Sequence, residues 1–264
     1  MTDARRADRH RLYQQAVQDP EAEMNFVEWT FEALRGRLIR SIREDFCGTA
    51  YSACEFVSRD PEHRAWAVDL DRDVLRWGRK HNVAGLSKDA RRRIELVKAD
   101  VRAPGTPAVD AVLAMNFSYY LFDDRSAMRG YFESVRGSLG PDGLFFLDAY
   151  GGYEAHCDIE EPRECDGFTY IWEQADFNPI DQSMTCYIHF EFPDGSRLDR
   201  AFVYPWRLWV LPEIRELLLE AGFSRVRVYW EGTDEETGEG DGEFTETMVG
   251  TADAGWICYI VAEP

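Results

Sequence analysis

Apolar residues recur with two different periods along this chain. Between residues 41 and 150, short and almost continuously apolar runs alternate with stretches in which apolar residues return every three or four positions. Because buried parallel strands are apolar on both faces and are connected by amphipathic helices, this alternation predicts a doubly wound, mostly parallel α/β sheet. The expected strands are 38–42, 64–70, 94–100, 109–117 and 143–150, and the expected helices are 72–82 and 124–139.

Two segments depart from this alternation. Residues 1–40 carry apolar positions at helical spacing among dense charge, which predicts an N-terminal helical cap with a break at Asp19-Pro20. Residues 151–210 are rich in aromatic and β-branched residues, and turn sequences divide them, which predicts an antiparallel β insertion. The strands expected in the insertion are 168–177, 184–192 and 198–204.

The α/β pattern resumes after the insertion. A helix at 211–221, with Pro212 near its start and Gly222 at its end, is followed by strands at 226–230 and 256–261. The predicted organisation is therefore a helical cap, one α/β core and an inserted cover. The corresponding boundaries are 1–40 for the cap, 41–150 with 211–264 for the core, and 151–210 for the cover.

The charge balance narrows the classes of partner. The 264 residues include 49 Asp and Glu against 30 Lys and Arg, a net charge of −19. Because nucleic acids and anionic membranes are bound through Lys and Arg, we expect neither as a partner. No apolar run approaches the length of a membrane span, and no secretory signal is recognised, so we expect a cytoplasmic protein.

The sequence predicts no metal site. Its six cysteines are scattered without a C-x-x-C pair, so free and mostly buried thiols are expected. His156-Cys157 with Cys165 is the nearest approach to a cluster of soft-metal ligands. The segment 231–243 holds seven carboxylates and no basic residue, but its spacing does not match a calcium loop. We interpret it as a solvated acidic loop.

Acidic residues stand at the ends of three successive predicted strands. Glu44 opens the turn Glu44 to Ala50, whose small residues let backbone N–H groups approach a ligand. Asp69 closes the next strand, where a carboxylate can accept hydrogen bonds from ribose hydroxyls, and Asp100 closes the third, where it can accept one from an adenine amino group. Since ligands bind beyond the carboxyl ends of parallel strands, these acids predict a nucleoside site.

From residue 40 to 150 and again from 211 to 262, the chain resembles the class I S-adenosylmethionine-dependent methyltransferases. Their first-strand motif reads acid-x-Gly-x-Gly-x-Gly, and here Glu44, Phe46, Gly48 and Ala50 occupy its four positions. Phe46 cannot take a glycine-only conformation, so we expect it to pack beside the cofactor. The resemblance further implies a seven-stranded sheet, completed by the C-terminal strand.

The resemblance implies S-adenosylmethionine as cofactor and S-adenosylhomocysteine as product. An NAD-type cofactor is the alternative at the acid after the second strand, but the G-x-G-x-x-G fingerprint is missing. The cofactor-binding residues implied by the resemblance are Glu44, Phe46, Cys47, Gly48, Thr49, Asp69, Leu70, Asp100, Val101, Asn116 and Phe117.

Methyl transfer requires in-line displacement at the sulfonium methyl group, so alignment and exclusion of water matter most. The segment Asn116 to Tyr119 resembles the Asn-Pro-Pro-Tyr motif of amino-group methyltransferases, in which the Asn side chain and a backbone carbonyl accept the amine's N–H bonds. The alternative is that Asn116 contacts the cofactor or the loop backbone, and that Tyr119 and Tyr120 are packing residues. The candidate catalytic residues are Asn116, Tyr119 and Tyr13, the last from the helical cap.

The insertion offers aromatic and charged side chains for an acceptor. Rings could enclose a small amphipathic substrate, Arg207 could bind a carboxylate, and Glu173 an amine. The alternative is that these rings only bury one face of a sheet. The candidate substrate-binding residues are Tyr150, Trp172, Glu173, Tyr204, Arg207 and Trp209, with Tyr153 and Trp206 nearby.

The sequence therefore predicts a methyltransferase acting on a small molecule, with nitrogen slightly favoured over oxygen as the acceptor atom. A protein or peptide acceptor is one alternative, and arsenite held by Cys47, Cys157 and Cys165 is another. A protein of a different class, which binds S-adenosylmethionine without catalysis, is the third. The oligomeric state is not predicted.

Overall fold

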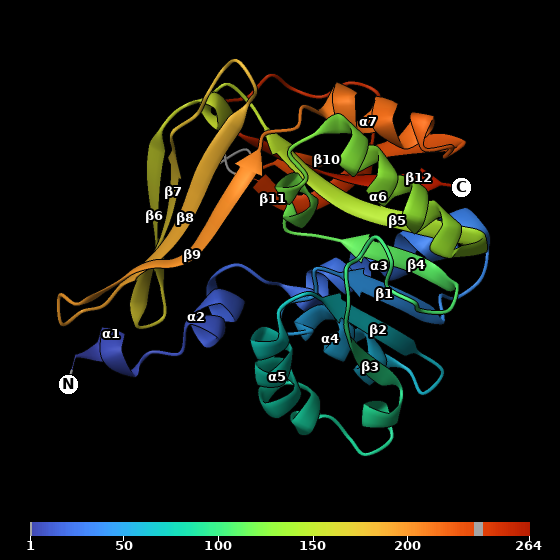
Figure 1. Cartoon of the computed structure of the whole chain (residues 1–264), viewed down its shortest axis with the longest axis horizontal. Helices are drawn as coiled ribbons and strands as arrows, with labels where there is room; N and C mark the ends of the chain where they lie inside the picture. The colour runs from blue at the N-terminus through green and yellow to red at the C-terminus, as the bar shows by residue number, and fades with distance from the viewer. Residues whose placement is uncertain (1, 235–239) are drawn as a thin grey trace.

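The computed structural model describes residues 2–234 and 240–264, which form two β-sheets with helices packed around the larger one (Figure 1). The larger sheet has eight strands in the order β11-β10-β12-β5-β4-β1-β2-β3. Its strands are β1 (Ser41–Asp45), β2 (Arg64–Asp69), β3 (Ile94–Lys98), β4 (Val109–Ala114), β5 (Leu139–Gly151), β10 (Arg225–Thr233), β11 (Gly240–Glu246) and β12 (Trp256–Glu263).

Strands β1 to β5 run parallel, and β12 lies antiparallel between β5 and β10. Helices cover both faces, so the predicted fold class, a doubly wound and mostly parallel sheet, is confirmed. One face packs against α3 (Pro20–Arg35), α4 (Tyr51–Arg59) and α5 (Arg72–His81). The other packs against α6 (Arg125–Ser138) and α7 (Leu211–Glu220). Short 3₁₀ turns lie at Val83–Gly85 (η1), Ala90–Arg92 (η2), Ser118–Leu121 (η3) and Glu154–His156 (η4).

The core sheet has one strand more than the seven expected. β11 pairs with β10 at the sheet edge, within the segment that we interpreted as a solvated acidic loop. Phe244 explains the difference, because its ring packs against Tyr259 with centroids 4.2 Å apart and holds β11 against the sheet. Asp241 and Glu243 of β11 are exposed. Residues 235–239, which belong to the same predicted loop, lie outside the described residues.

The insertion forms the second sheet, with four antiparallel strands in the order β6-β7-β8-β9 (Figure 1). The edge strand β6 was not predicted, because most of its side chains are exposed and Pro162 interrupts the pattern. The three strands expected here are present with similar bounds. The strands are β6 (Ile159–Cys165), β7 (Phe168–Ala175), β8 (Ser183–Glu191) and β9 (Arg197–Arg207).

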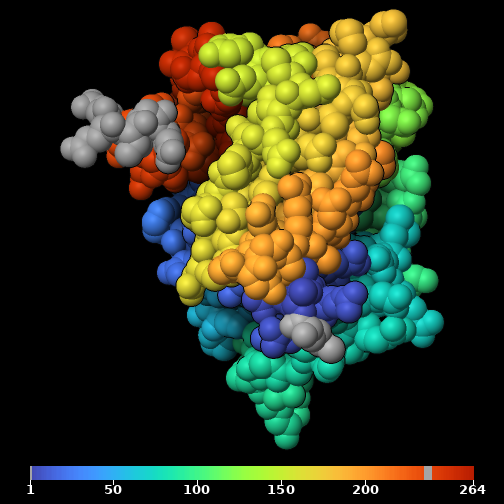
Figure 2. Space-filling model, turned by 90° about the vertical axis from the view of Figure 1, so that its left-hand side faces the viewer, coloured from blue at the N-terminus to red at the C-terminus, as the bar shows by residue number. Residues whose placement is uncertain are grey.

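The N-terminal helices α1 (Asp3–Arg6) and α2 (Arg9–Ala16) join the insertion to the core. Leu12 and Ala16 of α2 pack in one apolar cluster with residues of the insertion sheet. On the other side, Gln14 donates a hydrogen bond to Thr49 of the core at 2.8 Å. In the space-filling view the N-terminal segment lies directly beneath the insertion strands (Figure 2). Helices α1 and α2 and the insertion therefore cover the core together, whereas α3 packs directly on the sheet.

The loop after β1 is packed against α5 at a glycine. A Cβ on Gly78 would lie 2.3 Å from the backbone oxygen of Thr49, whereas a Cβ on Gly130 in α6 would meet nothing within 4 Å. We therefore expect Gly78→Ala to lower the free energy of unfolding by about 1–3 kcal/mol through overpacking. Gly130→Ala, a matched substitution in a helix, should raise it by about 0.5–1 kcal/mol. Urea denaturation measures both, and equal effects of the two variants would contradict this packing.

Candidate functional site

The loop between β1 and α4 has a left-handed backbone at alternate residues. Phe46 has φ 54°, Gly48 has φ 51° and Ala50 has φ 57°. These are the three positions at which the resembled motif has glycine, so the expectation that Phe46 avoids such a conformation is wrong. Left-handed backbone costs an L-residue roughly 1–2 kcal/mol. Part of the compensation comes from ring contacts of Phe46 with Phe122 and Tyr131, at centroid distances of 6.0 and 5.5 Å.

Asp69, at the end of β2, ties this loop to the neighbouring strand. Its carboxylate accepts hydrogen bonds from the backbone N–H groups of Gly48 and Asp71, both at 2.8 Å. Burial raises the pKa of Asp69. Asp100 differs, because Arg102 donates side-chain hydrogen bonds to it and lowers its pKa. Asp100 is therefore paired with a cation of the chain, whereas Asp69 forms no ion pair with Lys or Arg within the described residues.

A second group of acids lies deeper, where α3 meets the start of α4. Glu44 accepts a hydrogen bond from the backbone N–H of Ala53 at 2.9 Å, and Glu23 accepts one from the hydroxyl of Ser52 at 2.7 Å. The side chain of Asn116 also hydrogen-bonds Glu23. Burial raises the pKa of Glu23 to about 7 and raises that of Glu44 well above its usual range. No Lys or Arg side chain forms an ion pair with either acid within the described residues.

Asp148 on β5 positions the chain that leaves β4. Its two carboxylate oxygens accept the backbone N–H groups of Asn116 and Phe117, at 2.7 and 2.9 Å. Both of these residues have a left-handed backbone, with φ 58° and 53°. Burial raises the pKa of Asp148 to about 7. One buried carboxyl group thus fixes the direction of two successive side chains.

These segments surround a cavity of about 490 Å³ at the carboxyl ends of the parallel strands. Ten of the eleven residues expected to bind the cofactor line it, and Phe117 does not. The ten are Glu44, Phe46, Cys47, Gly48, Thr49, Asp69, Leu70, Asp100, Val101 and Asn116. The structure thus brings together the strand ends that the sequence pattern singled out.

The cover contributes the remaining wall of this cavity. Tyr13 of α2 and Tyr204 of β9 both line it and are hydrogen-bonded to each other. Burial raises the pKa of both phenols far above neutrality, so they donate hydrogen bonds and do not act as bases near pH 7. Trp206 lies against Tyr204 with ring centroids 4.8 Å apart and closes the same side.

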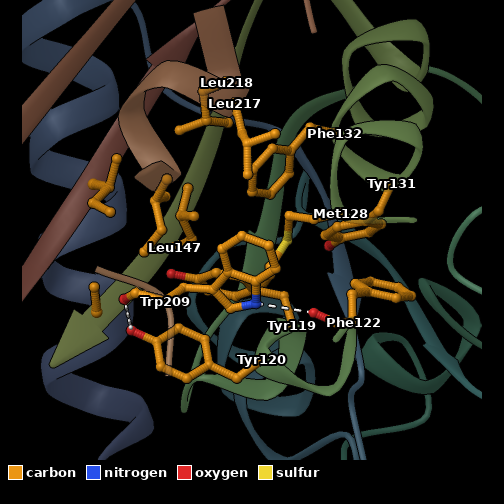
Figure 3. Packing of buried hydrophobic residues seen from close by; sticks show 14 of the residues in the cluster. Tyr119, Tyr120, Phe122, Met128, Tyr131, Phe132, Leu147, Trp209, Leu217 and Leu218 are labelled. Carbon is orange, nitrogen blue, oxygen red and sulfur yellow. Dashed lines mark hydrogen bonds between the residues drawn. The ribbon is translucent and has the colours of Figure 1, made fainter. Parts of the chain in front are cut away.

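Two predicted site residues are instead part of the hydrophobic core (Figure 3). The indole N–H of Trp209 donates to the backbone oxygen of Phe122 at 2.9 Å, and its ring is fully buried. Tyr119 is also fully buried, and its hydroxyl donates to the backbone oxygen of Asp148 at 2.5 Å. Neither lines the cavity. Their aromatic character reflects packing, the alternative reading given above.

The two charged residues expected to bind substrate are held by other side chains. Arg207 forms an ion pair with Glu213 at 3.1 Å and lies over the Trp209 ring at 3.8 Å. Glu173 accepts a hydrogen bond from His189 at 2.7 Å. Neither lines the cavity. Tyr150 and Trp172 lie with Phe117 around a second, separate cavity.

Several residues of the first cavity escaped the sequence analysis. The clearest is Glu23, which stands on the same helix face as the buried Val27 and Phe31. An acid within an apolar stripe is a signal that could have been recognised. The others include His10, whose ring lies 5.2 Å from that of Trp77. The remaining missed lining residues include Arg9, Ser52, Met115, Phe122, Phe202 and Pro205.

No protein-family model matches the chain, and no match is found among curated protein sequences. Solved structures do resemble it. An S-adenosylmethionine-dependent methyltransferase from Clostridium acetobutylicum superposes with a TM-score of 0.68 at 18% identity, covering 96% of this chain and 97% of the other.

Two further structures cover similar shares. The S-adenosylmethionine-bound amino pentose methyltransferase CalS10 from Micromonospora echinaspora gives a TM-score of 0.66 at 16% identity, covering 97% of this chain and 96% of that one. The sugar N-methyltransferase KedS8 from Streptoalloteichus gives a TM-score of 0.64 at 16% identity, and the match covers 97% of this chain and 92% of the other. The chain therefore has the fold of the S-adenosylmethionine-dependent methyltransferases, with the helical cap and insertion included in the match.

Other classes of site are not visible in the described parts of the chain. No group of three or more His, Cys, Asp or Glu side chains there could hold a metal ion. Across residues 2–234 and 240–264, no helix has the length and apolar character needed to cross a membrane. All six cysteines are free, and Cys157 and Cys165 lie on the insertion, apart from the cavity that contains Cys47.

Asp148→Asn tests the turn after β4. A carboxamide has one acceptor oxygen, so one of the two backbone N–H groups would lose its partner. We expect the free energy of unfolding to fall by about 2–3 kcal/mol. The control is Asp142→Asn, an exposed position of the same strand, which should change it by less than about 0.5 kcal/mol. Urea unfolding curves measure both, and a neutral Asp148→Asn would contradict the role of this carboxyl group.

Glu23 should give the stability of the ligand-free protein a specific pH dependence. Its folded pKa of about 7 exceeds the usual value of 4.5, so the stability it contributes is full below pH 4.5 and is lost as pH rises toward 7. Glu23→Gln removes this titration. Between pH 5 and 8 the free energy of unfolding of the variant should therefore rise relative to that of the wild type, by up to about 3 kcal/mol. Denaturation at a series of pH values measures the difference, and a constant difference would contradict the raised pKa.

Proposed function

We propose that this protein transfers the methyl group of S-adenosylmethionine to the nitrogen of a small-molecule amine. The observation that carries the proposal is the cavity in which carboxylates from three successive strand ends, Glu44, Asp69 and Asp100, lie around the left-handed loop after β1. Two of the structural neighbours are an amino pentose methyltransferase and a sugar N-methyltransferase, and their activities support nitrogen as the acceptor atom.

The residues present fit this cofactor in charge and shape. S-adenosylmethionine carries a sulfonium and an ammonium against one carboxylate, so its net charge is positive. Glu23, Glu44 and Asp69 line the cavity without an ion pair to Lys or Arg within the described residues, and buried carboxylates favour a nearby cation. The open space at Gly48, where a Cβ would meet nothing within 4 Å, leaves room for a ligand against the backbone.

Each part of the cavity would hold one part of the cofactor. Asp69 would accept hydrogen bonds from the ribose hydroxyls, and Asp100 with Val101 would contact the adenine. Glu23 and Glu44, near Asn116, would hold the ammonium of the methionine portion. When bound, S-adenosylmethionine would supply a methyl group on a positively charged sulfur: a nucleophile's lone pair forms a bond to the methyl carbon while the carbon–sulfur bond breaks on the opposite side, and the thioether leaves with the bonding electrons.

The chain's own contribution is alignment and exclusion of water. Tyr13, Tyr204 and Trp206 close the cavity from the cover, and their phenols stay protonated near neutral pH. A neutral amine needs no base before it attacks, and the ammonium that it forms loses its proton afterwards. The enclosure by α2 and β9 also supports a small molecule over a protein side chain as the acceptor. Free cysteines fit a reducing compartment, which supports the cytoplasm as the location.

An oxygen acceptor is the second candidate, because His10 could serve as its base. The ring of His10 lines the cavity, and burial together with Arg9 lowers its pKa, so the imidazole is neutral near pH 7 and can accept a proton. His10→Gln separates the candidates. The variant should retain the rate with an amine acceptor to within about threefold, whereas a loss of about 100-fold, the scale of general base catalysis, would indicate an alcohol.

The proposal is tested by release of S-adenosylhomocysteine from the full chain with a panel of amino sugars and alkylamines, beside the corresponding alcohols. Turnover is expected with an amine. Asp69→Asn should weaken binding of S-adenosylmethionine at least tenfold in calorimetry, because a ribose hydroxyl loses its charged acceptor. Asp73→Asn, an exposed acid in the next turn, should leave affinity unchanged. Failure of the wild type to bind S-adenosylmethionine would overturn the proposal, and binding without turnover on any panel member would favour a non-catalytic protein.

A further inference from the structure

A second cavity of about 340 Å³ lies between the insertion and the core sheet. Its walls come from the ends of β5 and β10, the start of β12, the turn η4 and the strands β6 and β7. None of these residues lines the first cavity. Its aromatic and polar lining residues are Phe117, Tyr150, Glu154, Glu161, Trp172, Gln174, Glu231 and Trp256.

The chemistry of this lining is specific. Four aromatic rings, those of Phe117, Tyr150, Trp172 and Trp256, come from four separate parts of the chain. Three acidic residues, Glu154, Glu161 and Glu231, join them, and no lining residue is Lys, Arg or His. Aromatic faces attract cations through their quadrupole, and carboxylates attract them through charge. An anion would meet repulsion here, and a neutral apolar ligand would use only the rings.

Glycines allow the ring wall to form. A Cβ on Gly151 would lie 2.2 Å from the ring of Trp256, so only glycine lets that indole lie across the end of β5. Gly152 has φ 109°, and a Cβ there would lie 2.2 Å from the backbone oxygen of Ala254. The segment that carries Trp256 is therefore held close to β5 by two adjacent residues without side chains.

Hydrogen bonds hold the acidic side of the cavity. The buried Gln174 donates from its side chain to the backbone oxygens of Glu154 and Cys157, at 3.2 and 3.3 Å, which fixes the turn that carries Glu154. Neither Glu154 nor Glu161 forms a side-chain ion pair within the described residues. Burial raises the pKa of Glu231, and Asp241 nearby adds to the effect. These acidic residues thus add negative charge to the cavity, and no Lys or Arg among the described residues forms an ion pair with them.

We propose that this second cavity binds an organic ammonium ion, at a site separate from that of the cofactor. An aromatic wall divides the two sites: Trp206 lines the first cavity, and its ring lies 6.4 Å from that of Phe117 and 5.9 Å from that of Trp172, which line the second. A substituted ammonium presents apolar groups to the rings and a positive charge to the carboxylates. The site does not depend on methyl transfer by the first cavity.

Calorimetry on the full chain tests the site with cations and their neutral counterparts. The probes are choline against 3,3-dimethylbutan-1-ol, and benzylamine at pH 7 against benzyl alcohol. At least one cation should bind at least tenfold more tightly than its neutral counterpart, and saturating S-adenosylhomocysteine should leave that affinity within about threefold. Absence of binding by both cations up to 10 mM, equal affinity for the neutral compounds, or competition with S-adenosylhomocysteine would each overturn the proposal.

Surface substitutions locate the bound cation without disturbing the core. The double variant Glu154→Gln, Glu161→Gln should weaken binding of the cation at least fivefold. The double variant Glu160→Gln, Glu164→Gln is the matched control, because it also removes two negative charges, from exposed residues of β6 that do not line the cavity, and it should change affinity less than twofold. Equal effects of the two variants would show that overall charge attracts the cation and would overturn the site. Binding of S-adenosylhomocysteine to each variant tests the first cavity independently.

Discussion

The buried carboxyl group of Asp148 is the interaction on which both cavities depend. It accepts the backbone N–H groups of Asn116 and Phe117, two consecutive residues that share a left-handed backbone. This backbone directs Asn116 to the first cavity and Phe117 to the second. Because a buried acceptor is stable only when its hydrogen bonds are made, the turn and the carboxyl group stabilise each other. The end of β4 thereby becomes part of the wall between two sites.

The net charge of −19 is a sum over the whole chain, but some of the acidic residues are grouped at the two cavities. Glu23, Glu44 and Asp69 lie in the first cavity, each raised in pKa by burial, and together they favour a ligand with positive charge. Glu154 and Glu161 line the second cavity beside aromatic rings. We therefore expect both cavities to favour cations, because acidic residues line each of them and aromatic rings line the second.

The sequence pattern predicted the sheet and the strand-end acids because both follow from local rules. Apolar runs and the connection of parallel strands bring Asp69 and Asp100 to one edge. The sequence could not show whether Trp209 contacts substrate or packs in the core, since a buried indole and a substrate-binding indole have the same sequence pattern. Arg207 was equally undetermined, because its partner Glu213 lies across a turn in the next helix. The edge strand β11 was missed because Phe244 is its only apolar residue, so the segment has no alternation of apolar and polar positions.

A crystal structure of the full chain with S-adenosylhomocysteine tests the central claim most directly. The account predicts the nucleoside at the ends of β2 and β3, with ribose hydroxyls on the carboxylate of Asp69 and the ammonium beside Glu23 and Glu44. The thioether sulfur should face the cover residues Tyr13 and Tyr204. A nucleoside bound elsewhere, or bound here with its ribose turned away from Asp69, would contradict the account.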